Sequence, residues 1–195
     1  YGATKLAMEK LFIAANNLKG KRKTKFSCVR YGNVLGSRGS VVPKFIEQIQ
    51  SQKKITITNP KMTRFNITLD DALELILHAI KFSRGNEVFI PKLKSYVLSD
   101  LVASLKDISS ISFSQKNISL RPGEKMHELL LNEYEIKFSI ESNGVYILLP
   151  SDFTNKSDIR KIYPKSKSLG LQVYSSDNVT HLSKNELKKI LIKNK

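Results

Sequence analysis

Two patterns of apolar residues follow one another along the chain. In the longer stretches, apolar residues recur every three or four positions. The shorter runs are either largely apolar or have apolar and polar residues in alternation. The first pattern is typical of amphipathic helices and occurs over 3–18, 41–52, 69–82, 99–106 and 184–192. The second is typical of strands and occurs over 25–31, 54–58, 87–90, 111–114 and parts of 134–149. Because helices and strands alternate, the pattern predicts an α/β fold with a parallel sheet.

The same pattern predicts which elements are buried. Run 25–31 is apolar on both faces, as in a strand with sheet neighbours and helices on either side. Helix 69–82 is apolar on most sides, so we expect it to be well buried, with His78 packed in the core. A turn at Pro122 and Gly123 is expected to lead into a further helix through about 130.

Composition narrows the class of protein. With 41% hydrophobic content, 195 residues are enough for an ordinary globular core. Cys28 is the single cysteine, which excludes an internal disulfide and favours a reducing, cytoplasmic compartment. No run reaches the roughly eighteen apolar residues that a membrane-spanning helix needs.

The net charge of +16 makes a basic nucleic-acid-binding module an alternative. The distribution of the charge favours a solvated surface instead. Only seven of the 33 basic residues are arginines, and the lysines are spread along the whole chain. Aromatic residues are not interleaved with them as a platform for stacking bases. We therefore expect no specific nucleic-acid partner.

The first residues carry the strongest candidate chemistry. Tyr1 and Lys5 are four positions apart, so a helix places both side chains on one face. A nearby ammonium favours the phenolate form of a tyrosine, which can then take a proton from a sugar hydroxyl as a hydride leaves the same carbon. The spacing alone is a weak pattern, because Tyr163 and Lys167 repeat it.

A glycine-rich loop, 32–40 (GNVLGSRGS), follows strand 25–31. In open α/β sheets, ligands bind beyond the carboxyl ends of the strands. The glycines allow close approach of the backbone, and Asn33, Ser37 and Arg38 offer hydrogen-bond donors. Taken alone, the loop is more typical of an ordinary surface turn.

Four blocks in order, YGATK at 1–5, VRYGNV with GSRG at 29–39, MTRF at 62–65 and RPGEK at 121–125, resemble one family. It is the extended short-chain dehydrogenases of bacterial polysaccharide biosynthesis. The chain is most similar to the inverting UDP-N-acetylglucosamine 4,6-dehydratases of pseudaminic-acid and related deoxysugar pathways. The resemblance covers almost the whole chain and is tightest over 1–131.

The resemblance implies the C-terminal part of an NAD(P)-binding Rossmann fold with a small interleaved substrate domain. It assigns 1–35 and 57–90 to the Rossmann domain, 36–56 and 91–150 to the nucleotide-sugar-binding part, and 151–195 to a C-terminal extension. It implies dehydration of UDP-N-acetylglucosamine with inversion at C5. A homo-oligomer is expected for the full-length protein.

The resemblance also implies residue roles. NADP, or NAD, would be held by Tyr1, Lys5, Tyr31, Asn33 and Val34, of which Tyr1 and Lys5 are the catalytic pair. The UDP-sugar would be bound by Asn33, Arg38, Arg64, Arg121 and Glu124, with the arginines on the diphosphate and the carboxylate on the ribose. Arginine supplies the bidentate donors that a diphosphate needs, and a carboxylate can accept from a ribose diol. No metal is expected.

The chain departs from the family because the residues before the tyrosine are missing. These would include the glycine-rich cofactor loop and the aspartate and lysine that eliminate water. We therefore expect this chain alone to expose the apolar side of its first helix, and neither to bind NADP tightly nor to turn over. A C4 epimerase of the same fold, a retaining membrane-anchored dehydratase and a catalytically dead remnant remain alternatives. The retaining relatives usually carry methionine in place of Tyr1.

Overall fold

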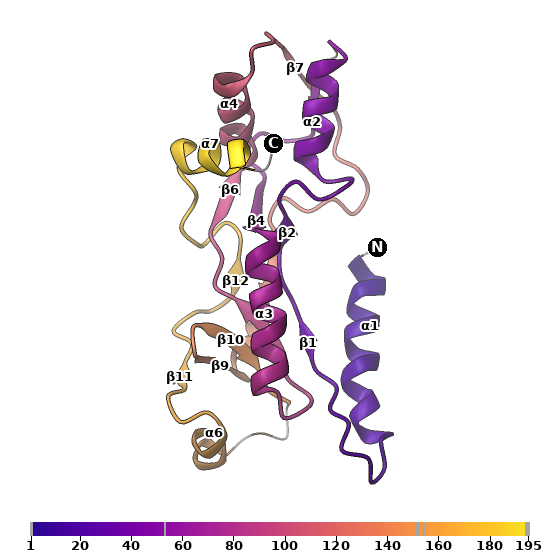
Figure 1. Cartoon of the computed structure of the whole chain (residues 1–195), viewed down its shortest axis with the longest axis vertical. Helices are drawn as coiled ribbons and strands as arrows, with labels where there is room; N and C mark the ends of the chain where they lie inside the picture. The colour runs from indigo at the N-terminus through magenta and orange to yellow at the C-terminus, as the bar shows by residue number, and fades with distance from the viewer. Residues whose placement is uncertain (1, 53, 151–152, 154, 194–195) are drawn as a thin grey trace. The chain divides into compact units, whose positions relative to one another are not determined.

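The computed structural model describes residues 2–52, 54–150, 153 and 155–193. The chain divides into two compact units, each assembled from three segments (Figure 1). Unit 1 comprises Tyr1–Tyr31, Asp70–Lys92 and Leu130–Tyr174. Unit 2 comprises Gly32–Leu69, Leu93–Leu129 and Ser175–Lys195.

Unit 1 is built on a mixed sheet. Its described strands follow the order β1 (Cys28–Val29), β5 (Val88–Pro91), β10 (Val145–Leu148), β9 (Ser139–Ser142) and β11 (Lys167–Ser168). β1 and β5 are parallel, with Cys28 opposite Val88, and the remaining pairs are antiparallel. Each of the parallel strands β1 and β5 follows a helix in the chain, as the sequence pattern predicts.

The helices of unit 1 are α1 (Gly2–Ala14), which continues as a short 3-10 turn (Ala15–Asn17), α3 (Leu69–Phe82), α5 (Glu133–Ile136) and α6 (Lys156–Ile162). Leu75 and Ala79 of α3 pack with Phe89 and Ile147 of the sheet to form the core. The His78 ring packs against Phe82, with 4.6 Å between ring centroids, which confirms its predicted place.

Much of the apolar surface of the two long helices in unit 1 is exposed. On α1, Leu11 is 72% exposed and Phe12 is 51% exposed, which confirms the exposure expected for this helix. On α3, an apolar stripe is more than half exposed at Leu69, Leu73, Leu77 and Ile80. The prediction of a well-buried α3 is therefore wrong, because only the side with Ala72, Leu75 and Ala79 packs in this chain.

Unit 2 contains two small sheets. β4 (Thr63–Ile67) lies between β2 (Asn33–Val34), to which it is parallel, and β6 (Ser95–Val97), to which it is antiparallel. The second sheet pairs β3 (Ile55–Ile57) with β7 (Gln115–Asn117) in parallel. A further short pair joins β8 (Leu129–Leu131) to β12 (Tyr174–Ser175).

Three helices close the core of unit 2: α2 (Val41–Gln50), α4 (Leu98–Ile108) and α7 (Lys184–Lys193). Phe45 and Ile49 of α2, Leu101 of α4 and Leu187 of α7 are all buried in one cluster with Ile55 of β3. Ser183 begins α7 as predicted, since the Glu186 amide donates to its hydroxyl at 3.3 Å. The same cluster includes Ile57 of β3 and Tyr96 of β6, so this core supports those two strands.

Three predicted elements need correction. Strand 25–31 shrinks to Cys28–Val29, which is half-buried rather than buried on both faces. Strand 111–114 is displaced to β7, where exposed polar residues pair through their backbone with β3. The helix expected after Gly123 does not form, because the carbonyl oxygens of Lys125 and Met126 accept hydrogen bonds from the Arg64 side chain instead.

The predicted domain boundaries also differ from the observed units. Segment 57–69 belongs to unit 2, because β4 pairs with β2 and β6 there. Segment 130–150 belongs to unit 1, because β9 and β10 extend the sheet of β5. Residues 151–195 form no separate extension, since the described part of 151–174 joins unit 1 and that of 175–195 joins unit 2.

Candidate functional site

Unit 2 contains a pocket that gathers four of the predicted site residues. Its empty volume is about 810 Å³, the open solvent at its mouth included. Asn33, Arg64, Arg121 and Glu124 line it. The wall also includes polar Lys44, Thr56 and Thr58 and apolar Val41, Phe45, Ile57, Met62, Tyr96, Leu98 and Ile118, with Gly39 at the loop. Apart from Gly39 and Met62, which belong to the GSRG and MTRF blocks, the sequence analysis does not single out these residues.

Arg64 comes from β4 and is largely enclosed, with a side chain 14% exposed. Its guanidinium carries five N–H groups, and all of them face acceptors. These are the carbonyl oxygens of Thr63, Lys125 and Met126 at 2.7, 2.9 and 3.0 Å, the Met62 sulfur at 3.5 Å and a Glu128 carboxylate oxygen at 3.4 Å. Arg64 therefore anchors the 121–128 segment, and its two longest contacts are the ones that a ligand could replace.

The turn at 121–124 is fixed by Glu124. One carboxylate oxygen accepts from the Arg121 amide at 3.2 Å and the other accepts from the Thr58 hydroxyl at 3.0 Å. Gly123 has a φ of +78°, a conformation that L side chains rarely adopt, which explains a glycine at this turn. The Arg121 side chain stays exposed, and among the described residues no ion pair holds it.

Asn33 lies on β2, opposite Asn66 of β4. The two strands can approach because of Gly32, where an added Cβ would lie only 2.4 Å from the Phe65 Cβ. Val34 is half-buried on the same strand. Arg38 is exposed in the following turn, and although Gly39 lines the pocket, Arg38 is not among the lining residues.

Tyr96 forms part of the pocket wall and is almost fully buried. Burial raises the pKa of its phenol to about 12, although the nearby positive charge of Arg64 acts in the opposite direction. The phenol therefore stays protonated at neutral pH and keeps its hydrogen-bond donor.

The remaining predicted residues belong to the other unit. Tyr1 lies outside the described residues. Lys5 is exposed on α1, and Tyr31, which is 37% exposed, follows β1. The structure therefore brings together Asn33, Arg64, Arg121 and Glu124 but not Arg38. The predicted catalytic pair remains a prediction.

An ion network in unit 1 had no signal in the sequence beyond charge. Arg30 donates to both carboxylate oxygens of Glu9, at 2.6 and 2.9 Å, and to both of Glu135, at 2.8 and 2.9 Å. It also donates to the Leu130 carbonyl at 2.6 Å. Glu9 is the only buried residue among those described in α1, and it lies four positions after Lys5. The network thus joins the Lys5 helix to the end of β1.

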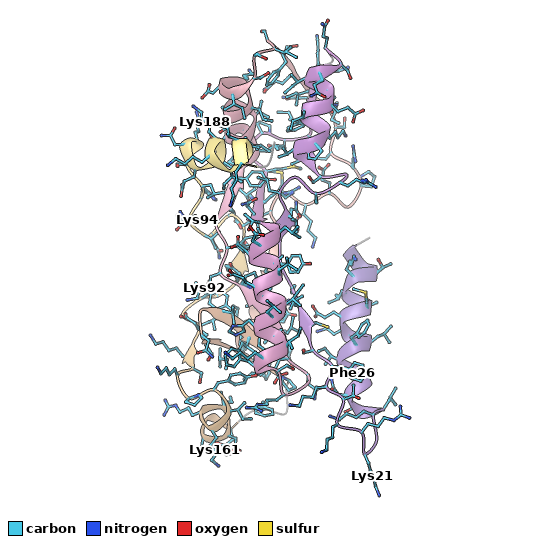
Figure 2. All side chains as sticks on the ribbon, viewed as in Figure 1. Lys21, Phe26, Lys92, Lys94, Lys161 and Lys188 are labelled. Atoms are coloured by element: carbon cyan, nitrogen blue, oxygen red, sulfur yellow. The ribbon has the colours of Figure 1, made fainter. Side chains whose placement is uncertain are left out.

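The positive charge is spread over both units. Figure 2 labels Lys92 and Lys161 in unit 1 and Lys94 and Lys188 in unit 2. Each of these four forms an ion pair with an acidic residue: Glu141, Asp158, Glu186 and Asp107, respectively. Such exposed pairs are ordinary features of a solvated surface.

Comparison with known proteins identifies the family. Residues 1–150 match the sequence profile of the polysaccharide biosynthesis protein family. The chain belongs to this family. It is 39% identical over 198 residues to a Campylobacter jejuni protein named UDP-N-acetylglucosamine 4,6-dehydratase (inverting), covering 98% of this chain and 58% of the relative. It is also 35% identical over 192 residues to a Rickettsia bellii protein named UDP-glucose 4-epimerase, covering 98% of this chain and 56% of that protein.

The fold prediction is confirmed by a solved structure, that of Pen from Bacillus thuringiensis. The TM-score is 0.85 at 37% identity, and the match covers 100% of this chain and 57% of that one. The chain has the α/β Rossmann-type fold of extended short-chain dehydrogenases, and it spans little more than half the length of these family members. No described helix is both long and apolar enough to cross a bilayer. Across the described residues there is also no group of histidine, cysteine and acidic side chains suited to a metal ion.

Proposed function

We propose that the protein is an NADP-dependent UDP-N-acetylglucosamine 4,6-dehydratase that inverts C5 and serves bacterial surface glycan or deoxysugar synthesis. The observation that carries the proposal is the unit 2 pocket, which gathers Asn33, Arg64, Arg121 and Glu124 from three separate stretches of sequence. The Campylobacter relative, whose printed name states this activity, supports the choice of reaction.

The pocket residues suit the UDP part of such a substrate. The unpaired Arg121 guanidinium is available for bidentate contacts to a diphosphate. Each carboxylate oxygen of Glu124 already accepts one hydrogen bond, and a carboxylate has room for further donors such as ribose hydroxyls. The Asn33 amide can donate to a phosphate oxygen. Arg64 adds positive charge while it holds the segment that carries Arg121 and Glu124.

The residues present also fit a nicotinamide cofactor. Exposed Tyr31 and Asn33 follow the carboxyl end of the parallel strand β1, which is where ligands bind in such sheets. Tyr1, Lys5, Tyr31, Asn33 and Val34 would hold NADP, which supplies hydride acceptance and return when bound. Tyr1 would take the proton of the sugar C4 hydroxyl, and the Lys5 ammonium would favour the phenolate.

The test is incubation with UDP-N-acetylglucosamine and NADP, followed by NMR of the sugar product. The N-terminal part of the Campylobacter relative, supplied as a fusion or a separate chain, provides the residues that this chain does not cover. We expect a 4-keto-6-deoxy sugar from the combination and no turnover from this chain alone. A combination that folds, binds UDP and forms no keto sugar would contradict the proposed reaction.

A C4 epimerase is the second candidate, because the Rickettsia relative carries that name at 35% identity. Both reactions need the same UDP site, so the pocket does not separate them. The product distinguishes the two reactions, since an epimerase forms UDP-N-acetylgalactosamine with its C6 hydroxyl intact. Detection of that epimer without a keto sugar would replace the first candidate with the second.

We further propose a cytoplasmic location and a homo-oligomer for the full-length protein. Cys28 as the single cysteine supports a reducing compartment. The exposed apolar stripes on α1 and α3 support burial against further protein. Light scattering of the fusion at several concentrations tests the oligomer, and a monomer at all of them would contradict it.

A further inference from the structure

Lys44 is a cationic residue of the pocket to which the sequence pattern gave no role. It lies in the first turn of α2, is exposed, and lines the same pocket as Arg121. A positive charge is disfavoured at a helix N-terminus, where the helix dipole is itself positive. The first turn of α2 also contains no acidic residue that would offset the lysine. A bound anion would remove this conflict.

The charges around the pocket leave Lys44 and Arg121 available. Arg64 is matched by Glu128 at 3.4 Å, and Glu124 is engaged by Thr58 and the Arg121 amide. Among the described residues, no ion pair holds either Lys44 or Arg121. Glu124 is the one carboxylate among the lining residues, so the three cations Lys44, Arg64 and Arg121 leave the lining with a net positive charge that suits an anion.

A buried hydroxyl lies beside Lys44. Ser40 precedes α2 between two lining residues, Gly39 and Val41, but its hydroxyl does not cap the helix. Its oxygen is buried and has no hydrogen-bond partner among the described residues. Buried polar atoms without partners are uncommon, and Ser40 itself is not among the residues that line the pocket.

We propose that Lys44 is a phosphate-binding residue that makes this pocket prefer a nucleoside diphosphate over a monophosphate. The inference rests on the proposed function, because it takes the pocket as the UDP site. Lys44 and Arg121 neutralise the two phosphates together. A monophosphate, which carries less charge, gains less from the second cation.

The test is titration of the 195-residue chain with UDP, UMP and uridine by calorimetry, in wild type and Lys44→Gln. The variant should bind UDP about three- to tenfold more weakly and UMP less than about twofold more weakly, with the UDP difference shrinking as salt rises. Lys189→Gln is the matched control, since it removes an exposed helical lysine of α7 outside the pocket, and it should bind like wild type.

The outcomes separate this inference from the proposed function. Wild type that binds UDP while Lys44→Gln binds it equally well would overturn the role of Lys44 alone. An equal loss for UDP, UMP and uridine would also overturn it, because it would indicate a damaged pocket rather than a lost phosphate contact. Wild type that binds neither UDP nor UMP would overturn the UDP site itself.

Discussion

The Arg30 network of unit 1 gives the sharpest stability prediction. Replacing Arg30 with Met keeps the length of an unbranched side chain but removes the charge and all the N–H donors. Glu9 and Glu135 would then remain enclosed, since their side chains are 11% and 12% exposed. Their remaining contacts are the Lys10 ammonium, 3.7 Å from Glu9, and the Asn132 amide, 3.2 Å from Glu135. The Leu130 carbonyl would lose its donor as well.

The expected loss is large because two enclosed carboxylates lose the guanidinium that donates to all four of their oxygens. Removing one partner of a buried ion pair costs about 3 to 5 kcal/mol. With a urea dependence of about 2 kcal/mol per M, the unfolding midpoint should fall by about 2 M. Arg30→Met with Glu9→Gln and Glu135→Gln removes the stranded charges, and we expect it to recover at least half of the loss.

The pH dependence provides a second readout. Although burial alone would raise the pKa of Glu135, its hydrogen bonds to Arg30 lower the pKa below the usual value. A carboxyl with a lowered folded-state pKa stabilises the fold above its unfolded pKa, about 4.3, and this stability is lost as the pH falls through the folded pKa. In Arg30→Met the shift should reverse, so acidification toward pH 4 should help the variant relative to wild type.

Urea unfolding followed by circular dichroism at pH 7 and pH 4.5 measures both effects. If Arg30→Met unfolds within about 1 kcal/mol of wild type and shows the same pH trend, the carboxylates are not held as described. A triple variant no more stable than Arg30→Met would equally refute the reasoning, because the cost would then not come from unpaired charge.

Three further predictions concern packing, charge and chemistry. Gly32→Ala should destabilise by about 1 to 3 kcal/mol in thermal melts, because its Cβ would clash with that of Phe65, whereas Gly170→Ala has open space and should change little. DNA should bind weakly and without sequence preference, and its affinity should fall steeply between about 50 and 200 mM salt. A complex that resists salt and depends on DNA sequence would contradict the dehydratase proposal. In the combination that turns over, Tyr1→Phe should keep UDP affinity and lower kcat, and unchanged kcat would remove Tyr1 from the chemistry.

The sequence predicted those elements whose own residues determine them. The periodicity of α1, α2, α3 and α7 and the apolar runs of β3 and β5 are local signals, and these elements were found within a few residues. Exposure was less predictable. Most of α3 is apolar, but which face packs depends on the neighbours present, and only the Ala72, Leu75 and Ala79 side meets the sheet.

The sequence pattern did not predict elements whose conformation depends on side chains far away in the sequence. The sequence after Gly123 has a helical pattern, but Arg64, about sixty positions earlier, donates hydrogen bonds to the carbonyl oxygens of this segment. The family resemblance named Asn33, Arg64, Arg121 and Glu124, which line the pocket, and their binding roles stay predictions. Lys44 was missed, since one lysine among many carries no signal until the fold places it in the pocket.

The central claim is that the unit 2 pocket binds the UDP part of a nucleotide sugar, and calorimetric titration of the 195-residue chain with UDP tests it most directly. Hydrogen bonds to charged groups contribute about 1.5 to 3 kcal/mol, so Arg121→Ala should weaken UDP binding about tenfold to a hundredfold. Arg160→Ala, which removes an exposed arginine of α6 in unit 1, should leave it unchanged. Saturable UDP binding that is lost selectively in Arg121→Ala is the predicted result. Absence of binding in wild type, or equal affinity in wild type and Arg121→Ala, would contradict the account.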